Sequence, residues 1–224
     1  MKILLFGATG MVGQGVLLEA LDAADVTSVV TVGRTAPVQV DARLQSILHG
    51  DAFDYADIEP RLAPFDACFF CLGVTSAGMG EAEYSRLTYD LTIAAATTLS
   101  RLNPQMTFVY VSGAGTDSSE QGRSMWARVK GRTENALLAL PFKSVYLFRP
   151  GMIQPLRGVR SKTSSYQMMY SLMRPLLPLL RSLMPSTVLT TAVVGRAMLA
   201  AARREPARKI LETADINALG TASA

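Results

Sequence analysis

The chain has few of the residues that hold structural metals or disulfides. Its 224 residues include two cysteines and one histidine. Cys68 and Cys71 stand three positions apart in an apolar run, and side chains at that spacing face opposite sides of a strand. Without a second pair of ligands, we expect no zinc or redox site. Two thiols in a core strand are typical of a reducing compartment, so we expect a cytoplasmic protein.

Long apolar segments are also missing. No uninterrupted apolar span reaches the roughly 18 to 20 residues that a membrane helix needs, and glycines interrupt the amino-terminal run where a signal peptide would continue. The formal net charge is +4, but the basic residues are scattered and form no stripe with interleaved aromatic residues. We therefore expect no nucleic-acid partner.

The sequence does contain a regular alternation of apolar runs and helical patterns. Hydrophobic residues make up 49% of the chain, whose length suits one α/β domain. The alternation predicts right-handed β–α–β units and a doubly wound parallel sheet of the Rossmann type, with 151–190 as a substrate or lid segment of the single domain 1–224. The expected strands are 2–6, 26–32, 45–49, 67–72, 107–112 and 144–148. The expected helices are 11–23, 81–101, 124–140 and 192–203.

A glycine-rich turn joins the first expected strand to the first expected helix. Glycines let backbone N–H groups approach phosphate oxygens, and the helix N-terminus adds partial positive charge. This placement predicts a dinucleotide pyrophosphate site, and the alternative is a turn that serves only strand–helix packing. The turn reads Gly7-Ala8-Thr9-Gly10-Met11-Val12-Gly13, and all of these except Ala8 are candidate cofactor-binding residues.

Further cofactor-binding candidates follow other expected strands, whose carboxyl ends share one edge of the sheet. Arg34 follows the second strand, where an NAD-preferring site usually places an acidic residue. Its guanidinium suits a 2′-phosphate and predicts NADP(H) over NAD(H), the alternative being a surface arginine. Asp51 is a candidate for the adenine amino group. Leu72, Gly73 and Thr75 are candidates for the cofactor ribose.

Together these motifs resemble the atypical short-chain dehydrogenase/reductase superfamily, especially small NAD(P)H-binding members related to the Tat-interacting oxidoreductase-like protein and to NAD-dependent epimerase/dehydratase proteins. The resemblance implies oxidoreductase or epimerase-like chemistry on a small organic substrate. It places Pro150 near the nicotinamide, and we expect Arg149 to pair with an acid below that edge. Besides the glycine turn, the motifs are Cys71-Leu72-Gly73-Val74-Thr75, Val129-Lys130-Gly131-Arg132-Thr133-Glu134, Arg149-Pro150-Gly151 and Leu211-Glu212.

The resemblance also implies a catalytic serine, a tyrosine, and a lysine four residues after the tyrosine. Ser112 and Lys130 match the serine and the lysine, and Lys130 is also expected to bind the cofactor ribose. Trp126 stands at the tyrosine position, and its indole N–H is a donor that cannot relay a proton. Two functions therefore remain open: an NADP(H)-dependent oxidoreductase without the tyrosine, or an NADP(H)-sensing protein without turnover.

Segment 161–185 is rich in Met, Leu and Arg. Its apolar residues fall at helical spacing, although Pro175 and Pro178 must kink or break a helix. Three roles stay open for it: a substrate lid, a homodimer or partner face, and a peripheral membrane contact.

Overall fold

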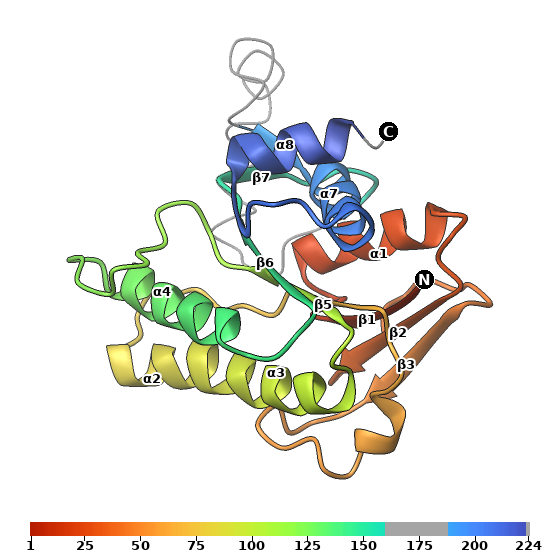
Figure 1. The fold of residues 1–224 in the computed structure, drawn as a ribbon, viewed down its shortest axis with the longest axis horizontal. Helices are drawn as coiled ribbons and strands as arrows, with labels where there is room; N and C mark the ends of the chain where they lie inside the picture. The colour runs from red at the N-terminus through yellow and green to blue at the C-terminus, as the bar shows by residue number, and fades with distance from the viewer. Residues whose placement is uncertain (160–187, 223–224) are drawn as a thin grey trace.

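The structure is a computed structural model that describes residues 1–159 and 188–222 (Figure 1). Segment 161–185 lies outside the described residues, so the three roles considered for it remain predictions. Within the described ranges, no helix combines the length and apolarity needed to cross a membrane.

A seven-stranded parallel sheet forms the middle layer (Figure 1). Its strand order is β3-β2-β1-β4-β5-β6-β9, so the direction in which strands are added reverses between β1 and β4. This confirms the predicted doubly wound Rossmann sheet. The strands are β1 (Lys2–Phe6), β2 (Ser28–Gly33), β3 (Leu44–Leu48), β4 (Ala67–Phe70), β5 (Thr107–Val111), β6 (Ser144–Arg149) and β9 (Ile210–Glu212).

Helices cover both faces of this sheet, which explains why its central strands β4 and β6 are buried along their whole length (Figure 1). In β1, Ile3 and Leu5 pack into one core cluster while Leu4 and Phe6 pack into the other. The first face carries α1 (Met11–Asp22), α7 (Thr191–Arg204) and α8 (Thr213–Thr221). The second carries α2 (Glu81–Ser85), the π-helical turn η2 (Arg86–Asp90), α3 (Leu91–Leu102) and α4 (Met125–Leu138).

Helices α1 and α7 approach each other closely through small residues. A Cβ on Gly15 would lie 2.5 Å from the Thr191 side chain, and a Cβ on Gly195 would lie 2.8 Å from the Glu19 side chain. Larger residues would push the helices apart. This contact holds α1, and therefore its N-terminus, firmly against the sheet.

Several short elements were not predicted from the sequence. They are η1 (Glu59–Arg61), β7 (Met152–Gln154), β8 (Val188–Thr190), β9 and α8. Strands of three residues are too short for apolar alternation to reveal them. Predicted boundaries also shift by one or two residues: the strand expected at 26–32 is β2, and the helix expected at 81–101 is divided by η2.

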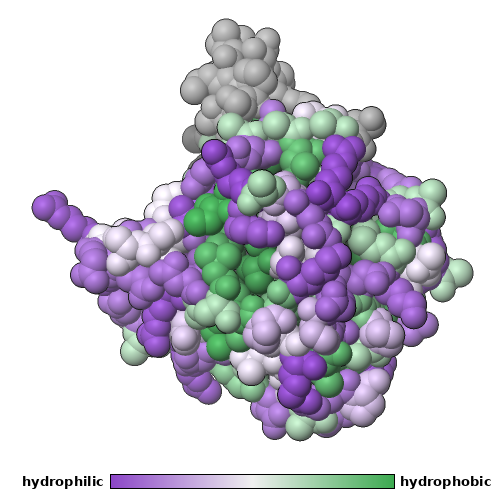
Figure 2. Space-filling view, viewed as in Figure 1, coloured by the Kyte–Doolittle hydropathy of each residue, from purple (hydrophilic) through white to green (hydrophobic). Residues whose placement is uncertain are grey.

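The short strand β9 covers only the carboxyl half of β6, through pairs from Leu147 to Arg149. Partly buried Leu140, Phe142 and Ile210 pack on the core cluster beneath this side. Seen from the direction of Figure 1, hydrophobic residues gather near the centre of the surface (Figure 2).

Candidate functional site

The glycine turn between β1 and α1 is shaped by close backbone contacts. Gly7 has φ +77°, and a Cβ there would lie 2.7 Å from the Cys71 carbonyl carbon. A Cβ on Gly13 would lie 2.1 Å from the Gly7 carbonyl oxygen. The Gly10 amide donates to that same oxygen at 2.9 Å and closes the turn. The chain's own packing therefore requires Gly7 and Gly13, whether or not a ligand binds.

This turn leads directly into the N-terminus of α1. Gly10 is the N-cap, it offers no side-chain cap, and the first turn holds no acidic residue. Amides at Met11, Val12 and Gly13 belong to the helix start, where N–H groups have no intrahelical acceptor. Together with the helix dipole they favour an anion such as a phosphate. The Thr9 carbonyl oxygen accepts a hydrogen bond from Gln14 Nε2 at 3.0 Å and steadies the turn.

The remaining cofactor candidates lie along the same carboxyl edge. The Cys71 amide donates to the Phe6 carbonyl oxygen at 3.0 Å, which places Leu72 and Gly73 beside the glycine turn at the point where the strand order reverses. Ligands of doubly wound sheets bind at this point. Arg34 and Asp51 follow β2 and β3 on one side of it, and Ser112 and Pro150 follow β5 and β6 on the other.

Three of the candidate residues that follow β2, β3 and β4 are exposed: Arg34, Asp51 and Thr75. Asp51 accepts a hydrogen bond from the Phe53 amide at 2.8 Å, and Thr75 Oγ1 accepts one from the Ala77 amide at 3.3 Å. Arg34 is exposed, and within residues 1–159 and 188–222 no protein group pairs with its guanidinium. Its five donors are free for a ligand.

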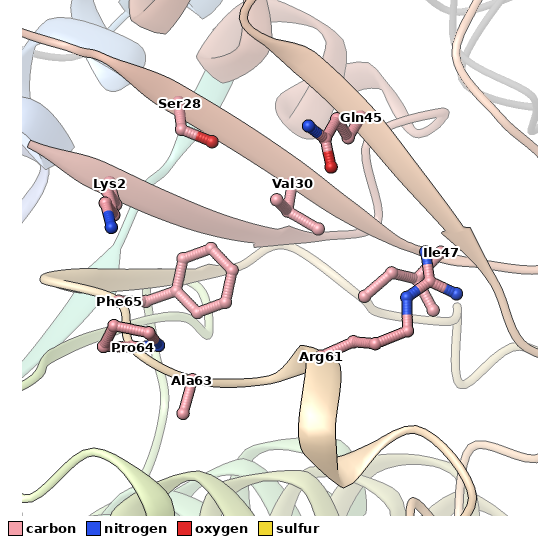
Figure 3. Close-up of a pocket in the computed structure, with 9 residues that line it drawn as sticks. All are labelled: Lys2, Ser28, Val30, Gln45, Ile47, Arg61, Ala63, Pro64 and Phe65. Atoms are coloured by element: carbon pink, nitrogen blue, oxygen red, sulfur yellow. The ribbon is translucent and has the colours of Figure 1, made fainter.

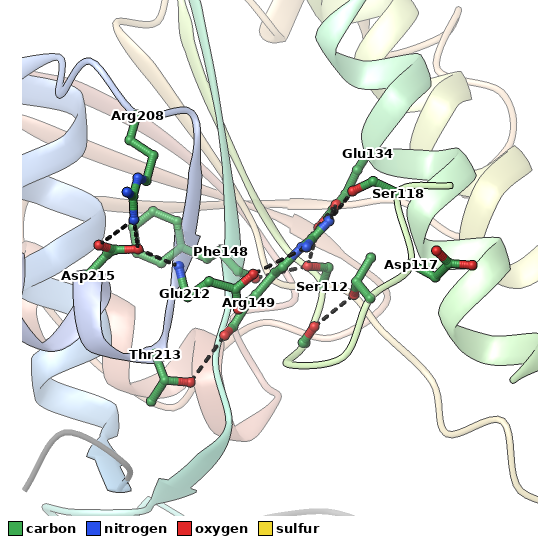
Figure 4. A network of polar contacts seen from close by, with 12 residues as sticks. Ser112, Asp117, Ser118, Glu134, Phe148, Arg149, Arg208, Glu212, Thr213 and Asp215 are labelled. Carbon is green, nitrogen blue, oxygen red and sulfur yellow. Dashed lines mark hydrogen bonds and ion pairs between the residues drawn. The ribbon is translucent and has the colours of Figure 1, made fainter. Parts of the chain in front are cut away.

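On the β5 side, the Ser112 hydroxyl is bound inside the protein (Figure 4). Its Oγ donates to Glu134 Oε1 at 2.6 Å and lies 3.1 Å from the Phe148 carbonyl oxygen. Glu134 is completely buried, and Arg149 neutralises it through Nε at 3.1 and 3.2 Å and through Nη2. Because a hydroxyl has one proton to donate, Ser112 is committed to this buried ion pair.

Arg149 extends the network to the carboxyl-terminal part of the chain (Figure 4). Its Nη2 donates to Ser118 Oγ at 2.5 Å and its Nη1 to Glu212 Oε1 at 3.2 Å. Hydrogen bonding to Glu134 raises the pKa of Arg149, so the guanidinium stays charged. Glu212 in turn forms a capping box with Asp215 at the start of α8. One arginine thus ties β6, α4, the loop after β5 and α8 together.

Lys130 lies beside the end of β5. Its Nζ donates to the Ser112 carbonyl oxygen. Burial lowers the pKa of Lys130 to about 8, against the opposing effect of the Glu134 carboxylate. At the next residue, a Cβ on Gly131 would lie 1.7 Å from the Asp117 carbonyl oxygen. The loop after β5 therefore crosses α4 at Gly131, which explains the Lys130-Gly131 pair in the sequence.

Trp126 lies one helical turn before Lys130, on the same face of α4. A Cβ on Gly115, which has φ +87°, would lie 3.5 Å from Trp126 Cη2. The indole therefore contacts the loop after β5. Of the three residues expected to be catalytic, Lys130 contacts the backbone carbonyl of Ser112 and not its hydroxyl, and Trp126 lies one turn from Lys130 on α4.

Glu134 and Ser118 were not among the predicted site residues. The sequence did hold a signal for Glu134: the buried residues of α4 include Ala127, Gly131 and Leu137, and Glu134 falls on the same stripe. A carboxylate on an apolar stripe must find a buried partner. The expectation that Arg149 pairs with an acid is confirmed by Glu134 and Glu212.

Two cavities lie at the opposite, amino end of the strands. One, of about 300 Å³, is lined by Lys2, Val30, Ile47, Arg61 and Phe65 among others (Figure 3). The other, of about 410 Å³, lies on the far side of Pro64 and Phe65. Neither touches the carboxyl edge. Among the described residues, no group of three or more His, Cys, Asp or Glu could hold a metal ion.

Comparisons with known proteins bear on this arrangement. No protein-family model matches the chain. The mitochondrial protein FMP52-2 of Scheffersomyces stipitis is 30% identical over 163 residues, which cover 72% of this chain and 69% of that protein. The chain belongs to the FMP52 family. The mitochondrial protein fmp52-2 of Aspergillus oryzae is 29% identical over 224 residues, which cover 96% of this chain and 95% of its own length.

These FMP52 relatives correct one expectation. We expected a cytoplasmic protein because two cysteines lie in a core strand, but the relatives are named as mitochondrial proteins. The cytoplasmic assignment is therefore wrong. Buried reduced thiols do not distinguish these compartments, because burial is the main cause that raises the thiol pKa of Cys68 and Cys71 and so lowers their reactivity.

Solved structures share the fold of this FMP52 family member. UDP-glucuronic acid 4-epimerase from Bacillus cereus, in complex with NAD, has a TM-score of 0.67 at 14% identity and covers 95% of this chain and 78% of its own. A short-chain dehydrogenase/reductase from Saccharomyces cerevisiae has a TM-score of 0.62 at 15% identity, with coverage of 100% and 99%. The resemblance to this superfamily is thus confirmed at the level of the fold.

Proposed function

We propose that this protein binds NADP(H) across the carboxyl edge of its sheet and acts as an oxidoreductase of the atypical short-chain class on a small organic substrate. The observation that carries the proposal is the turn from Gly7 to Gly13, which aims the N-terminus of α1 at the point where the strand order reverses. Solved structures of this fold include complexes with NAD, which supports a dinucleotide as the ligand.

In this proposal each half of the edge holds one half of the cofactor. The pyrophosphate lies on the α1 N-terminus, and the adenosine half extends over β2 and β3 toward Asp51. The exposed Arg34 guanidinium binds the 2′-phosphate. The nicotinamide half extends past Gly73 toward Pro150, and Lys130 holds the nicotinamide ribose. The cofactor supplies the hydride, while the residues named here bind and orient it.

Arg34 provides a direct test of cofactor choice. Hydrogen bonds to charged groups contribute about 1.5–3 kcal/mol, so Arg34→Ala should weaken NADPH binding by roughly tenfold or more. NADH lacks the 2′-phosphate, so its affinity should not change. Intrinsic NADPH and NADH fluorescence titrations measure both. Arg61→Ala, at an exposed arginine on the amino end of the sheet, is the matched control.

Three results would count against the proposal. No binding of either nucleotide by the parent protein would overturn the cofactor site. Tighter binding of NADH than of NADPH would overturn the role of Arg34. An equal loss of both affinities in Arg34→Ala would show that the arginine acts on the shape of the site and not on the 2′-phosphate.

A second function, NADP(H) sensing without turnover, is favoured by two observations. The Ser112 hydroxyl is committed to Glu134, and Trp126 replaces the tyrosine. The two functions share one cofactor site and differ in whether bound NADPH is consumed. Oxidation of NADPH with a carbonyl substrate, followed at 340 nm, supports the enzyme, and binding without consumption supports the sensor.

A further inference from the structure

This inference rests on the proposed function and concerns the proton that completes a carbonyl reduction. Hydride transfer to a carbonyl carbon pushes the π electrons onto oxygen, which must then take a proton. At the Ser112 end of β5, the hydroxyl proton is bound by Glu134 at 2.6 Å. Trp126 contributes an indole N–H, which does not ionise near neutral pH. Neither residue supplies that proton.

Two neighbouring tyrosines do not replace the missing one. Tyr84 on α2 and Tyr110 on β5 are 2% and 1% exposed, so both are buried in the interior. Burial raises the pKa of each phenol above its usual value. A phenol that holds its proton more tightly and lies away from solvent is a poor general acid for a substrate at the edge of the sheet.

Lys130 has the geometry that these groups lack. Its Nζ donates to the Ser112 carbonyl oxygen, which leaves two of the three ammonium hydrogens for other acceptors. That anchor holds the nitrogen at the carboxyl end of β5. The side chain is partly exposed at this edge, on the face of α4 that also carries Trp126. A substrate oxygen there meets an N–H donor that is already oriented.

We propose that Lys130 is the proton donor of the reaction, in addition to holding the cofactor ribose. Bound NADPH would supply a hydride, a hydrogen with its electron pair, which forms the new C–H bond at the carbonyl carbon. The carbonyl π bond breaks toward oxygen, and one Lys130 N–H bond breaks to form the alcohol O–H. NADPH is oxidised to NADP⁺, the carbonyl is reduced to an alcohol, and a solvent proton restores the ammonium.

The surroundings of Lys130 suit this step. Burial lowers its pKa to about 8, so the side chain is an acid that gains and loses a proton close to neutral pH. Glu134, one turn later on α4, is a negative charge that opposes this lowering and is itself held by Arg149 from β6. Burial raises the pKa of Tyr84 and Tyr110 above that of a free phenol, so an ionisation near pH 8 is expected of Lys130 and not of these tyrosines.

The experiment uses the full chain, NADPH, and 4-nitrobenzaldehyde with a set of aliphatic aldehydes and ketones as probes. For the parent protein, kcat should be constant at low pH and fall about tenfold per pH unit above about 8. Lys130→Arg keeps the charge that holds the ribose but does not release a proton, because the guanidinium pKa exceeds 12. It should keep its NADPH affinity within about threefold and lose about 100-fold or more in kcat.

Lys130→Gln serves as a second variant, and Lys2→Arg, at an exposed lysine on the amino end of the sheet, is the matched control. Lys130→Gln should lose both NADPH affinity and kcat, and Lys2→Arg should change neither. A Lys130→Arg variant that keeps the parent kcat and pH profile overturns the inference while the oxidoreductase stands. Tight NADPH binding by the parent without reduction of any probe also overturns it and favours the sensor. Failure of the parent to bind NADPH overturns the proposed function itself.

Discussion

The two halves of the carboxyl edge are built in different ways. Over β1, β2 and β3 the edge consists of a backbone turn and exposed side chains, of which Arg34 has no partner among the described protein groups and Asp51 bonds only its own loop. Over β5 and β6 it rests on buried charges, with Ser112, Glu134 and Arg149 in one network. A side chain can be exchanged in the first half with little effect on folding. In the second half, a change to the polar residues also changes the stability of the sheet.

The largest expected effect follows from removing the positive charge of Arg149, at the centre of the second half. Arg149→Met leaves Glu134 buried without its partner, and breaking a buried pair in this way costs about 3–5 kcal/mol. Arg208→Met is the control, because Arg208 pairs with Asp215 at 3.0 Å on the surface and such pairs contribute about 0–1 kcal/mol. Urea unfolding measures both losses. Equal losses would show that the network adds no more than a surface pair.

The first half of the edge depends on the shape of its backbone, and a substitution at one of its glycines tests this dependence. Gly13→Ala places a Cβ within 2.1 Å of the Gly7 carbonyl oxygen, so the turn must open. Overpacking of this kind costs about 1–3 kcal/mol, and the displaced amides should no longer bind NADPH. Gly50→Ala is the matched control, because nothing lies within 4 Å of its Cβ position. Thermal unfolding with and without NADPH reports on both effects, and full NADPH binding by Gly13→Ala would contradict this account.

The same contrast explains how much the sequence predicts. The glycine turn and the parallel sheet are predictable because strand alternation and helix starts are local patterns. The partner of Ser112 is Glu134, 22 residues later, and no local pattern joins them. Arg149 was expected to pair with an acid, but only the fold shows that Glu134 and Glu212 lie within reach.

Gly131 is a residue that the sequence motif includes but whose physical reason only the structure shows. Its place after Lys130 fits the superfamily motif, but the physical reason is the Asp117 carbonyl oxygen, which lies where a Cβ would be. A backbone crossing of this kind depends on the path of a loop, which residue types do not specify. The roles of the side chains over β5 and β6 could therefore be assigned only from the structure, whereas the role of the turn after β1 could be predicted mainly from the sequence pattern.

The smallest effect that we expect concerns Lys130, whose Nζ contacts the end of β5 in the second half. Its pKa is lowered from 10.5 to about 8 in the folded protein, so between these values the unfolded chain binds more protons. The free energy of unfolding contributed by Lys130 therefore rises as the pH increases from about 8 to 10.5. Lys130→Met removes this rise. Tyrosine and cysteine ionisation is common to both proteins and cancels in the difference.

Urea unfolding of the parent and of Lys130→Met at pH 7.5 and pH 10 measures this difference, with Lys2→Met as the control at an exposed lysine. The parent should gain stability relative to Lys130→Met at the higher pH, and by more than it gains relative to Lys2→Met. A difference between parent and Lys130→Met that is the same at both pH values would mean that the Lys130 ammonium is solvated in the folded protein. The ammonium would then be exposed to water like the side chains over β2 and β3. The buried polar groups of the second half would be those of Ser112, Glu134 and Arg149 without Lys130.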